Sequence, residues 1–212
     1  MNKPSWKSLP GFLLAIAAGM CIAIGGIALL NIDNPVAGAF LFSIGLLTIC
    51  MFGFNLYTGK VCYFVEHPSL SYLFWLFSVW IGNFVGANLV AWAYHFTTGY
   101  TKVMDRVQTL VQAKCDSSLL SIFILACFCG IMIYIAVQGF KEATSGTLKV
   151  ASIILGVMVF ILCGFEHSIA NMFYFALAQN YSGQAFLILL VMSLGNAVGG
   201  MFFPFLRKLS NK

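Results

Sequence analysis

The chain has 212 residues, of which 61% are hydrophobic and only 8% are charged, and its formal net charge is +5. A soluble domain carries about 25% charged residues, so this chain has too few charges to coat a surface that faces water. The composition excludes a soluble globular protein and predicts an integral membrane protein solvated by the lipid bilayer. The positive charge fits the loops of such a protein and does not indicate nucleic-acid binding.

Long charge-free stretches predict six transmembrane helices, since a helix needs about 20 apolar residues to cross the hydrocarbon core. The last stretch is too long for one helix, and a polar turn at residues 180–184 divides it between the fifth and sixth spans. The first stretch exceeds the apolar region of a signal peptide, about 7–15 residues, so we expect an uncleaved helix. The stretches are residues 11–31, 37–59, 68–94, 117–140, 150–165 and 168–206.

Basic residues predict the orientation of these spans, because cytoplasmic loops collect Lys and Arg. With the N-terminus inside, only Lys102, Arg106 and Lys114 of the 11 basic residues fall on the one substantial outer loop. We therefore expect a multi-pass protein of the plasma (inner) membrane with both termini in the cytoplasm.

Two glycine–asparagine motifs reveal an internal repeat. Gly82-Asn83 in the third span and Gly195-Asn196 in the sixth are related by an offset of 113 residues. The same offset carries residues 55–59, which interrupt the second span, onto residues 168–172, which interrupt the fifth. One offset relating two features indicates duplication. We expect Asn83 and Asn196 to support the broken helices through backbone contacts.

Three spans per copy would place the second copy upside down in the membrane, as in many transporters. The predicted fold is all-α, with six transmembrane helices in two inverted three-helix repeats and with spans two and five interrupted. A single transmembrane domain covers residues 1–212. Within it we expect repeat one at about 8–95, an outer connecting loop at about 95–116 and repeat two at about 117–207.

The interruption of the fifth span contains Glu166 and His167, and ionisable residues inside the membrane are rare and usually line a pathway. We expect His167 to face a pore; the alternative is a hydrogen-bonded core histidine. Adjacent helical residues point about 100° apart, so we expect Glu166 to anchor loop backbone or a neighbouring chain instead. Thr58 offers a hydroxyl at the interruption of the second span. Half-helix N-termini meeting at these breaks would favour a small anion.

Nothing in the sequence predicts an enzyme, a cofactor or a metal site. His167 has no second histidine near it, and no nucleophile triad or phosphate-binding loop is present. The seven cysteines include no C-x-x-C pair, so we expect them to pack as small apolar residues.

The segment from Phe165 to Phe173 is similar to the signature of the formate/nitrite transporter family, and Leu56-Tyr57-Thr58-Gly59 resembles the second-span loop of that family. The resemblance covers nearly the whole chain. It implies a homopentamer with an aquaporin-like fold and one pore in each protomer. It also implies permeation of small monovalent anions or their conjugate acids, namely formate, nitrite or hydrosulfide.

The resemblance further assigns pore residues. It implies that Thr58 and His167 form the centre of the pathway, with Asn171 one turn further on, and that Lys114 lies in a vestibule. It implies a cytoplasmic constriction of Leu56, Tyr57 and Phe160 and an outer constriction of Phe42 and Leu46. The chain departs from the family at Tyr57, where Phe is frequent, and at Asn55 and Lys60.

A bare anion crossing an apolar constriction loses much of its hydration, whereas the neutral acid loses far less. We therefore expect permeation linked to protons at His167, with formate as the first candidate and nitrite or hydrosulfide as alternatives. A channel for neutral solutes, like the aquaporins, is the alternative of another class.

Overall fold

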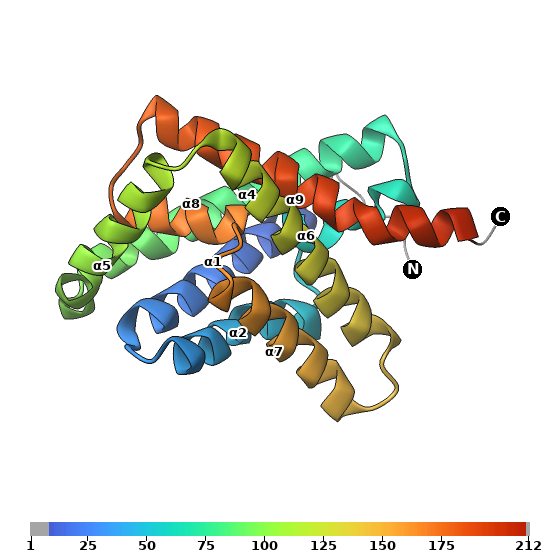
Figure 1. Ribbon diagram of the computed structural model, residues 1–212, viewed down its shortest axis with the longest axis horizontal. Coiled ribbons are helices and arrows are strands. Elements are labelled where there is room, and N and C mark those ends of the chain that lie inside the picture. The colour runs from blue at the N-terminus through green and yellow to red at the C-terminus, as the bar shows by residue number, and fades with distance from the viewer. Residues whose placement is uncertain (1–8, 211–212) are drawn as a thin grey trace.

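The computed structural model describes residues 9–210, and all regular structure in that range is helical (Figure 1). Short non-helical segments at residues 53–56 and 163–167 interrupt the helical structure. The elements are α1 (Leu9–Asn31), α2 (Pro35–Phe52), α3 (Tyr57–Lys60), the 3-10 helix η1 (Val61–Val65), α4 (Leu70–His95), α5 (Thr98–Cys115), α6 (Leu119–Glu142), α7 (Gly146–Leu162), α8 (Ser168–Leu177) and α9 (Gly183–Ser210).

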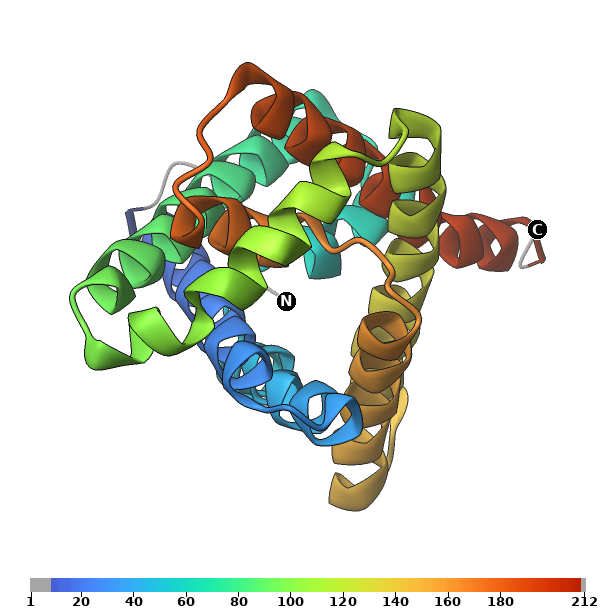
Figure 2. The same cartoon turned by 60° about the vertical axis from the view of Figure 1, so that its left-hand side comes forward.

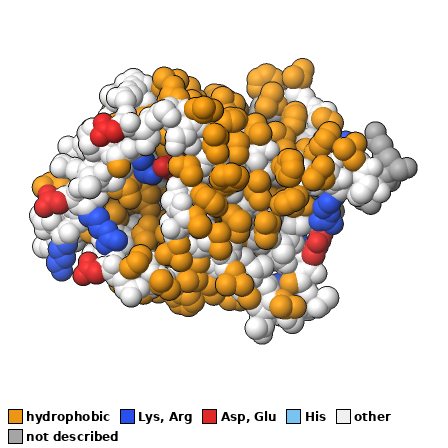
Figure 3. Space-filling view, in the orientation of Figure 1, with side chains coloured by type: hydrophobic (Ala, Val, Ile, Leu, Met, Phe, Trp, Pro, Cys, Tyr) orange, Lys and Arg blue, Asp and Glu red, His pale blue; other side chains and the backbone are white. Residues whose placement is uncertain are grey.

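Five of these helices, α1, α2, α4, α6 and α9, are long and apolar enough to cross a membrane. The shorter apolar helices α7 and α8 cover the region in which we expected the interrupted fifth span. Figure 3 shows hydrophobic side chains over the middle of one face, with charged side chains gathered toward its two ends. Large side chains such as Phe77, Leu155 and Leu194 are more than half exposed. These features identify an integral membrane protein.

The two ends of the molecule carry different elements. Helix α5 lies at one end, on the left of Figure 1, and we call this the α5 end. The turn between α6 and α7 and the C-terminal end of α9 lie at the opposite end, on the right, which we call the α9 end.

Local sequence explains where α2 begins and ends. The Asn34 side-chain oxygen accepts hydrogen bonds from the backbone N–H groups of Val36 and Ala37, both at 3.0 Å. Pro35 takes the first helical position, where a missing N–H leaves no bond unmade. Gly53 ends the helix at φ 72°, a left-handed conformation that glycine adopts without a steric cost.

The close approach of α1 to α4 is repeated between α6 and α9. A Cβ atom on Gly86 of α4 would collide with the carbonyl of Ile16 in α1, and one on Gly199 of α9 would collide with the carbonyl of Cys127 in α6. Small residues permit this packing, as in other membrane helix pairs. The matching contacts support the duplication inferred from the two glycine–asparagine motifs.

The connecting segment at 95–116, which we expected to be a loop, contains the helix α5. Val103, Val107 and Val111 lie four residues apart and are buried, so α5 packs one apolar stripe against the rest of the molecule. Figure 2 shows α5 crossing in front of α1 and α8, and both helices contact it. Because α5 carries many polar residues, it lacks the uniformly apolar composition that marks the membrane spans in the sequence.

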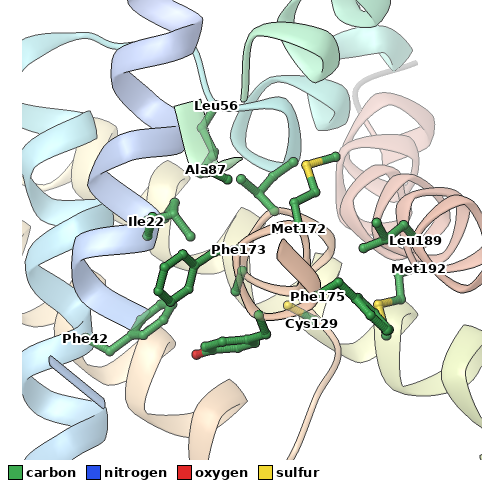
Figure 4. Close-up of a cluster of buried hydrophobic side chains, with 14 of the residues drawn as sticks. Ile22, Phe42, Leu56, Ala87, Cys129, Met172, Phe173, Phe175, Leu189 and Met192 are labelled. Atoms are coloured by element: carbon green, nitrogen blue, oxygen red, sulfur yellow. The ribbon is translucent and has the colours of Figure 1, made fainter. Parts of the chain in front are cut away.

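Helix α8 occupies the centre of the core, and all of its residues from Ser168 to Leu177 are buried. Figure 4 shows Met172, Phe173 and Phe175 of α8 directed toward different neighbours. Around them lie Ile22 of α1, Phe42 of α2, Ala87 of α4, Cys129 of α6 and Leu189 of α9.

Candidate functional site

Two helix breaks meet in the interior, and each contains a left-handed glycine. Gly53 (φ 72°) follows α2, and Gly164 (φ 66°) follows α7. After each glycine the chain runs extended for a few residues before a new helix begins at Tyr57 or at Ser168. Backbone that unwinds at membrane depth must satisfy its polar groups within the protein.

At each break, one asparagine side chain forms the hydrogen bonds that the interrupted backbone needs. The Asn83 side-chain oxygen accepts the N–H of Tyr57 at 2.8 Å, and its nitrogen donates to the carbonyls of Ala15 and Asn55 at 2.7 and 2.9 Å. Each asparagine therefore joins the start of a half-helix to the loop before it and to a neighbouring long helix.

Asn196 makes the same three bonds in the second half of the chain. Its oxygen accepts the N–H of Ser168 at 2.9 Å, and its nitrogen donates to the carbonyls of Ala126 and Glu166 at 2.9 and 2.8 Å. Both asparagine side chains are fully buried.

These bonds correct the alignment of the two breaks. The offset of 113 residues holds for Asn83 and Asn196, but it is wrong for the loops, where Asn55 corresponds to Glu166 and Tyr57 to Ser168. The loops are related by 111 residues, as the glycines Gly53 and Gly164 are. The sequence alone could not reveal this two-residue difference, because the loops share too few side chains to align.

Thr58 and His167 lie together where the breaks meet. Thr58 Oγ1 is 2.9 Å from His167 Nε2, and both side chains are buried. His167 is also the N-cap of α8, since its Nδ1 accepts the backbone N–H of Ala170 at 3.1 Å. A backbone N–H only donates, so Nδ1 carries no hydrogen and the neutral ring holds its hydrogen on Nε2. This hydrogen points to the Thr58 hydroxyl, which leaves the hydroxyl hydrogen for another acceptor.

Two phenylalanines cover the histidine. The Phe160 ring stacks on His167, with centroids 5.6 Å apart and an interplanar angle of 21°. The Phe42 ring meets Phe160 edge-on at 5.9 Å. We expected Phe160 to share a constriction with Leu56 and Phe42 to share one with Leu46; in the structure the two phenylalanine rings contact each other.

Leu46 and Leu56 instead line a common cavity of about 150 Å3. Phe42 lies one turn before Leu46 on α2. One turn of this helix therefore carries Phe42, which contacts Phe160, and the next carries Leu46, which lines the cavity. The lining of the cavity does not include Tyr57. The Tyr57 hydroxyl donates to the Ser193 carbonyl at 3.2 Å, which directs the ring toward α9.

Glu166 pairs with Lys114. The Lys114 ammonium lies 2.8 and 2.7 Å from the two Glu166 oxygens, and the side chains are only 15% and 9% exposed. The Asn171 amide nitrogen donates to Glu166 Oε2 and to the His167 carbonyl, both at 2.9 Å. We expected Glu166 to anchor loop backbone or another chain, because we took Glu166 and His167 to be adjacent residues of a helix. The pair Glu166-His167 is extended instead, so its two side chains point to different sides of the break.

Three polar atoms on α8 are buried without a hydrogen-bond partner in the described part of the chain: Ser168 Oγ, Asn171 Oδ1 and the Tyr174 hydroxyl. Ser168 directly follows His167 in the chain, and Asn171 donates a hydrogen bond to Glu166. Nowhere between residues 9 and 210 do three His, Cys, Asp or Glu side chains gather in a way that could hold a metal ion.

Comparison with known proteins places this arrangement in a family. The model of the family described as formate/nitrite transporter matches residues 1–208. The chain is 30% identical over 217 residues to the nitrite transporter NirC of Escherichia coli (strain K12), covering 91% of this chain and 80% of NirC. It is 27% identical over 192 residues to the formate channel FocA of Haemophilus influenzae, covering 81% and 67% of the two chains.

Solved structures share the fold. One described as an FNT family ion channel superposes with a TM-score of 0.85 at 25% identity, covering 96% of this chain and 90% of the other. Another, described as a pentameric formate channel with formate bound, superposes with a TM-score of 0.79 at 24% identity, covering 98% of both. The chain therefore belongs to the formate/nitrite transporter family, whose members are membrane channels and transporters rather than enzymes.

Proposed function

We propose that this protein is a homopentameric channel that passes small monovalent anions or their conjugate acids, with formate as the first candidate and nitrite and hydrosulfide as alternatives. The observation that carries the proposal is the buried contact between Thr58 and His167 at the meeting point of two broken helices. The relatives named for nitrite and formate support the class of substrate.

The proposed architecture has six spans in two inverted repeats, with the protein in the plasma (inner) membrane. The matching hydrogen bonds of Asn83 and Asn196 support two equivalent halves. An odd number of spans in each half makes the second half inverted. The distribution of basic residues in the sequence supports a cytoplasmic α9 end and an outer α5 end. The structural relative described as pentameric supports five copies.

The pathway we propose passes two apolar constrictions. Phe42 and Phe160 form the one nearer the α5 end, and Leu46 and Leu56 form the one nearer the α9 end. A bare anion would lose most of its hydration at either place, whereas a neutral acid is far less penalised. Proton transfer to the anion between the constrictions therefore lowers the barrier.

His167 holds and orients Thr58 in this scheme. The Nε2 hydrogen donates to the Thr58 hydroxyl, which can in turn donate to an anion at the centre. A second proton on Nδ1 would break the N-cap bond with Ala170. We propose that His167 is neutral at rest. For each anion, a proton from water in the pathway binds Nδ1 and transiently replaces that bond; the Nε2 hydrogen then passes to the Thr58 oxygen as the Thr58 hydrogen passes to the anion, and the ring becomes neutral again. Asn171 and the ion pair between Glu166 and Lys114 stabilise the loop that carries His167.

Transport in proteoliposomes across a pH series tests the proposal. The unchanged protein should take up formate, nitrite or hydrosulfide faster as the pH falls, because the neutral acid becomes more abundant. His167→Phe should abolish the proton movement that accompanies uptake, while His67→Phe, at an exposed position in a turn, should leave it unchanged.

Equal proton-linked flux in His167→Phe and in the unchanged protein would refute a central role for the histidine. Rapid, pH-independent flux of urea or glycerol with no flux of the three anions would instead favour a neutral-solute channel.

A further inference from the structure

The cavity lined by Leu46 and Leu56 also contains two lysines. It lies between α2, α3 and α6, and Lys60 and Lys141 form part of its lining together with Cys50. Among residues 9–210, no aspartate or glutamate contributes to this lining. The cavity therefore places two positive charges beside the proposed constriction at the α9 end.

Neither lysine lies within ion-pair distance of a carboxylate in the described part of the chain. The ion pairs there join Lys114 to Glu166 and Arg207 to Glu142. Lys60 is half-buried. The Lys141 ammonium lies 3.6 Å from the centre of the Tyr63 ring, a contact that holds the side chain in place and keeps its charge.

Lys60 and Lys114 differ in whether a carboxylate balances their charge. Lys114 is buried against Glu166, so its charge is cancelled within the protein. Lys60 is withdrawn from water without such a partner, which is unfavourable unless an anion or water supplies one. A cleft lined by one sign of charge concentrates ions of the opposite sign. The charges of Lys60 and Lys141 therefore favour binding of an anion in this cavity at the α9 end.

We propose that this cavity is a binding site for a small monovalent carboxylate or oxyanion, held by Lys60 and Lys141 beside the Leu46 and Leu56 constriction before it reaches Thr58. The inference rests on the proposed function, because it takes the cavity to be continuous with the anion pathway. Each anion that moves from the α9 end toward the centre first occupies this site.

Flux measured separately from the two sides tests the site. In uniformly oriented proteoliposomes, the double variant Lys60→Gln and Lys141→Gln should raise the half-saturating formate concentration at the α9 side by about tenfold. The half-saturating concentration at the α5 side should change by less than about twofold. Lys149→Gln is the matched control, since Lys149 also lies near the α6–α7 turn but does not line the cavity. No change, or an equal change on both sides, would overturn the proposal.

A second measurement does not depend on transport. A chain in which Cys50 is the only cysteine should react about tenfold faster with a sulfonate-bearing methanethiosulfonate than with its trimethylammonium analogue, because the lysines attract the anionic reagent. Formate should slow this reaction in a saturable way. Replacing Lys60 and Lys141 by Gln should remove both effects. Equal rates for the two reagents, or an unreactive Cys50, would contradict the site.

The two measurements separate the hypotheses. If the unchanged protein carries none of the three anions but Cys50 keeps its preference and its protection by formate, the proposed function fails and the binding site stands. If flux is normal and the lysine substitutions change neither measurement, the site fails and the proposed function stands.

Discussion

At the first helix break Asn55 and Leu56 precede the new helix, whereas Glu166 and His167 occupy the same places at the second. The backbone around the two pairs is held in the same way, by Asn83 and Asn196. The side chains differ in charge and in partners: Asn55 donates to the Gly11 carbonyl at 3.0 Å, and Glu166 binds Lys114.

This difference shows that the hydrogen bonding of the broken backbone and the presence of charged side chains are independent features of a break. Any helix that breaks in the membrane interior leaves backbone groups that need partners, so both halves keep the asparagine. A charged network is not required for the break, since the first half manages without one. The ion pair and the histidine are therefore features particular to the second half: they stabilise its loop and, in our proposal, also serve permeation.

The largest effect should follow from replacing either asparagine. Asn83→Leu and Asn196→Leu each leave one N–H and two carbonyls without their partner, which should cost about 3 kcal/mol or more. We expect both variants to lose assembled protein and to show lower melting temperatures in detergent by similar amounts. Asn88→Leu is the control, because the Asn88 nitrogen bonds to the Phe84 carbonyl one turn earlier and the Asn88 oxygen accepts only a long bond of 3.4 Å from the exposed Tyr181 hydroxyl. A loss confined to Asn196→Leu would mean that the two breaks are not equivalent.

A smaller loss should follow from separating the ion pair at the second break. Glu166→Gln leaves the Lys114 ammonium buried without its counter-charge, at a cost of about 3 kcal/mol. The double variant with Lys114→Met should recover much of that stability in thermal unfolding. Glu142→Gln breaks the Arg207 pair, whose side chains are 54% and 52% exposed, and should cost much less stability because water screens the pair. If Glu166→Gln costs no more than Glu142→Gln, the network does not stabilise the second break.

The smallest effect should come from Asn55→Ala. The variant loses one half-buried hydrogen bond to the Gly11 carbonyl, so we expect a cost of about 1 kcal/mol. Formate flux should stay within about twofold of the unchanged protein, because Asn55 does not line the cavity and takes no part in the proposed anion pathway. A fall in flux as large as that of His167→Phe would show that the first break also carries chemistry.

The sequence by itself determined the class of protein, the places where helices break and the residues that mark those breaks. Composition excluded a soluble fold, and the glycine–asparagine motifs revealed the duplication. These features are local or repeated along the chain, so periodicity and composition suffice to find them. The contact between Thr58 and His167 came from the family resemblance, and the structure brings the two side chains to 2.9 Å.

Only the tertiary structure decided which side chains meet across the chain. It showed that the loops align two residues away from the offset in the sequence, and that the connecting segment contains the helix α5. It also showed the ion pair between Lys114 and Glu166 and the contact between Phe42 and Phe160. It also brought Lys60 and Lys141 to one cavity. Such contacts depend on how helices pack and on where an extended loop turns its side chains, and neither leaves a pattern in the residues themselves.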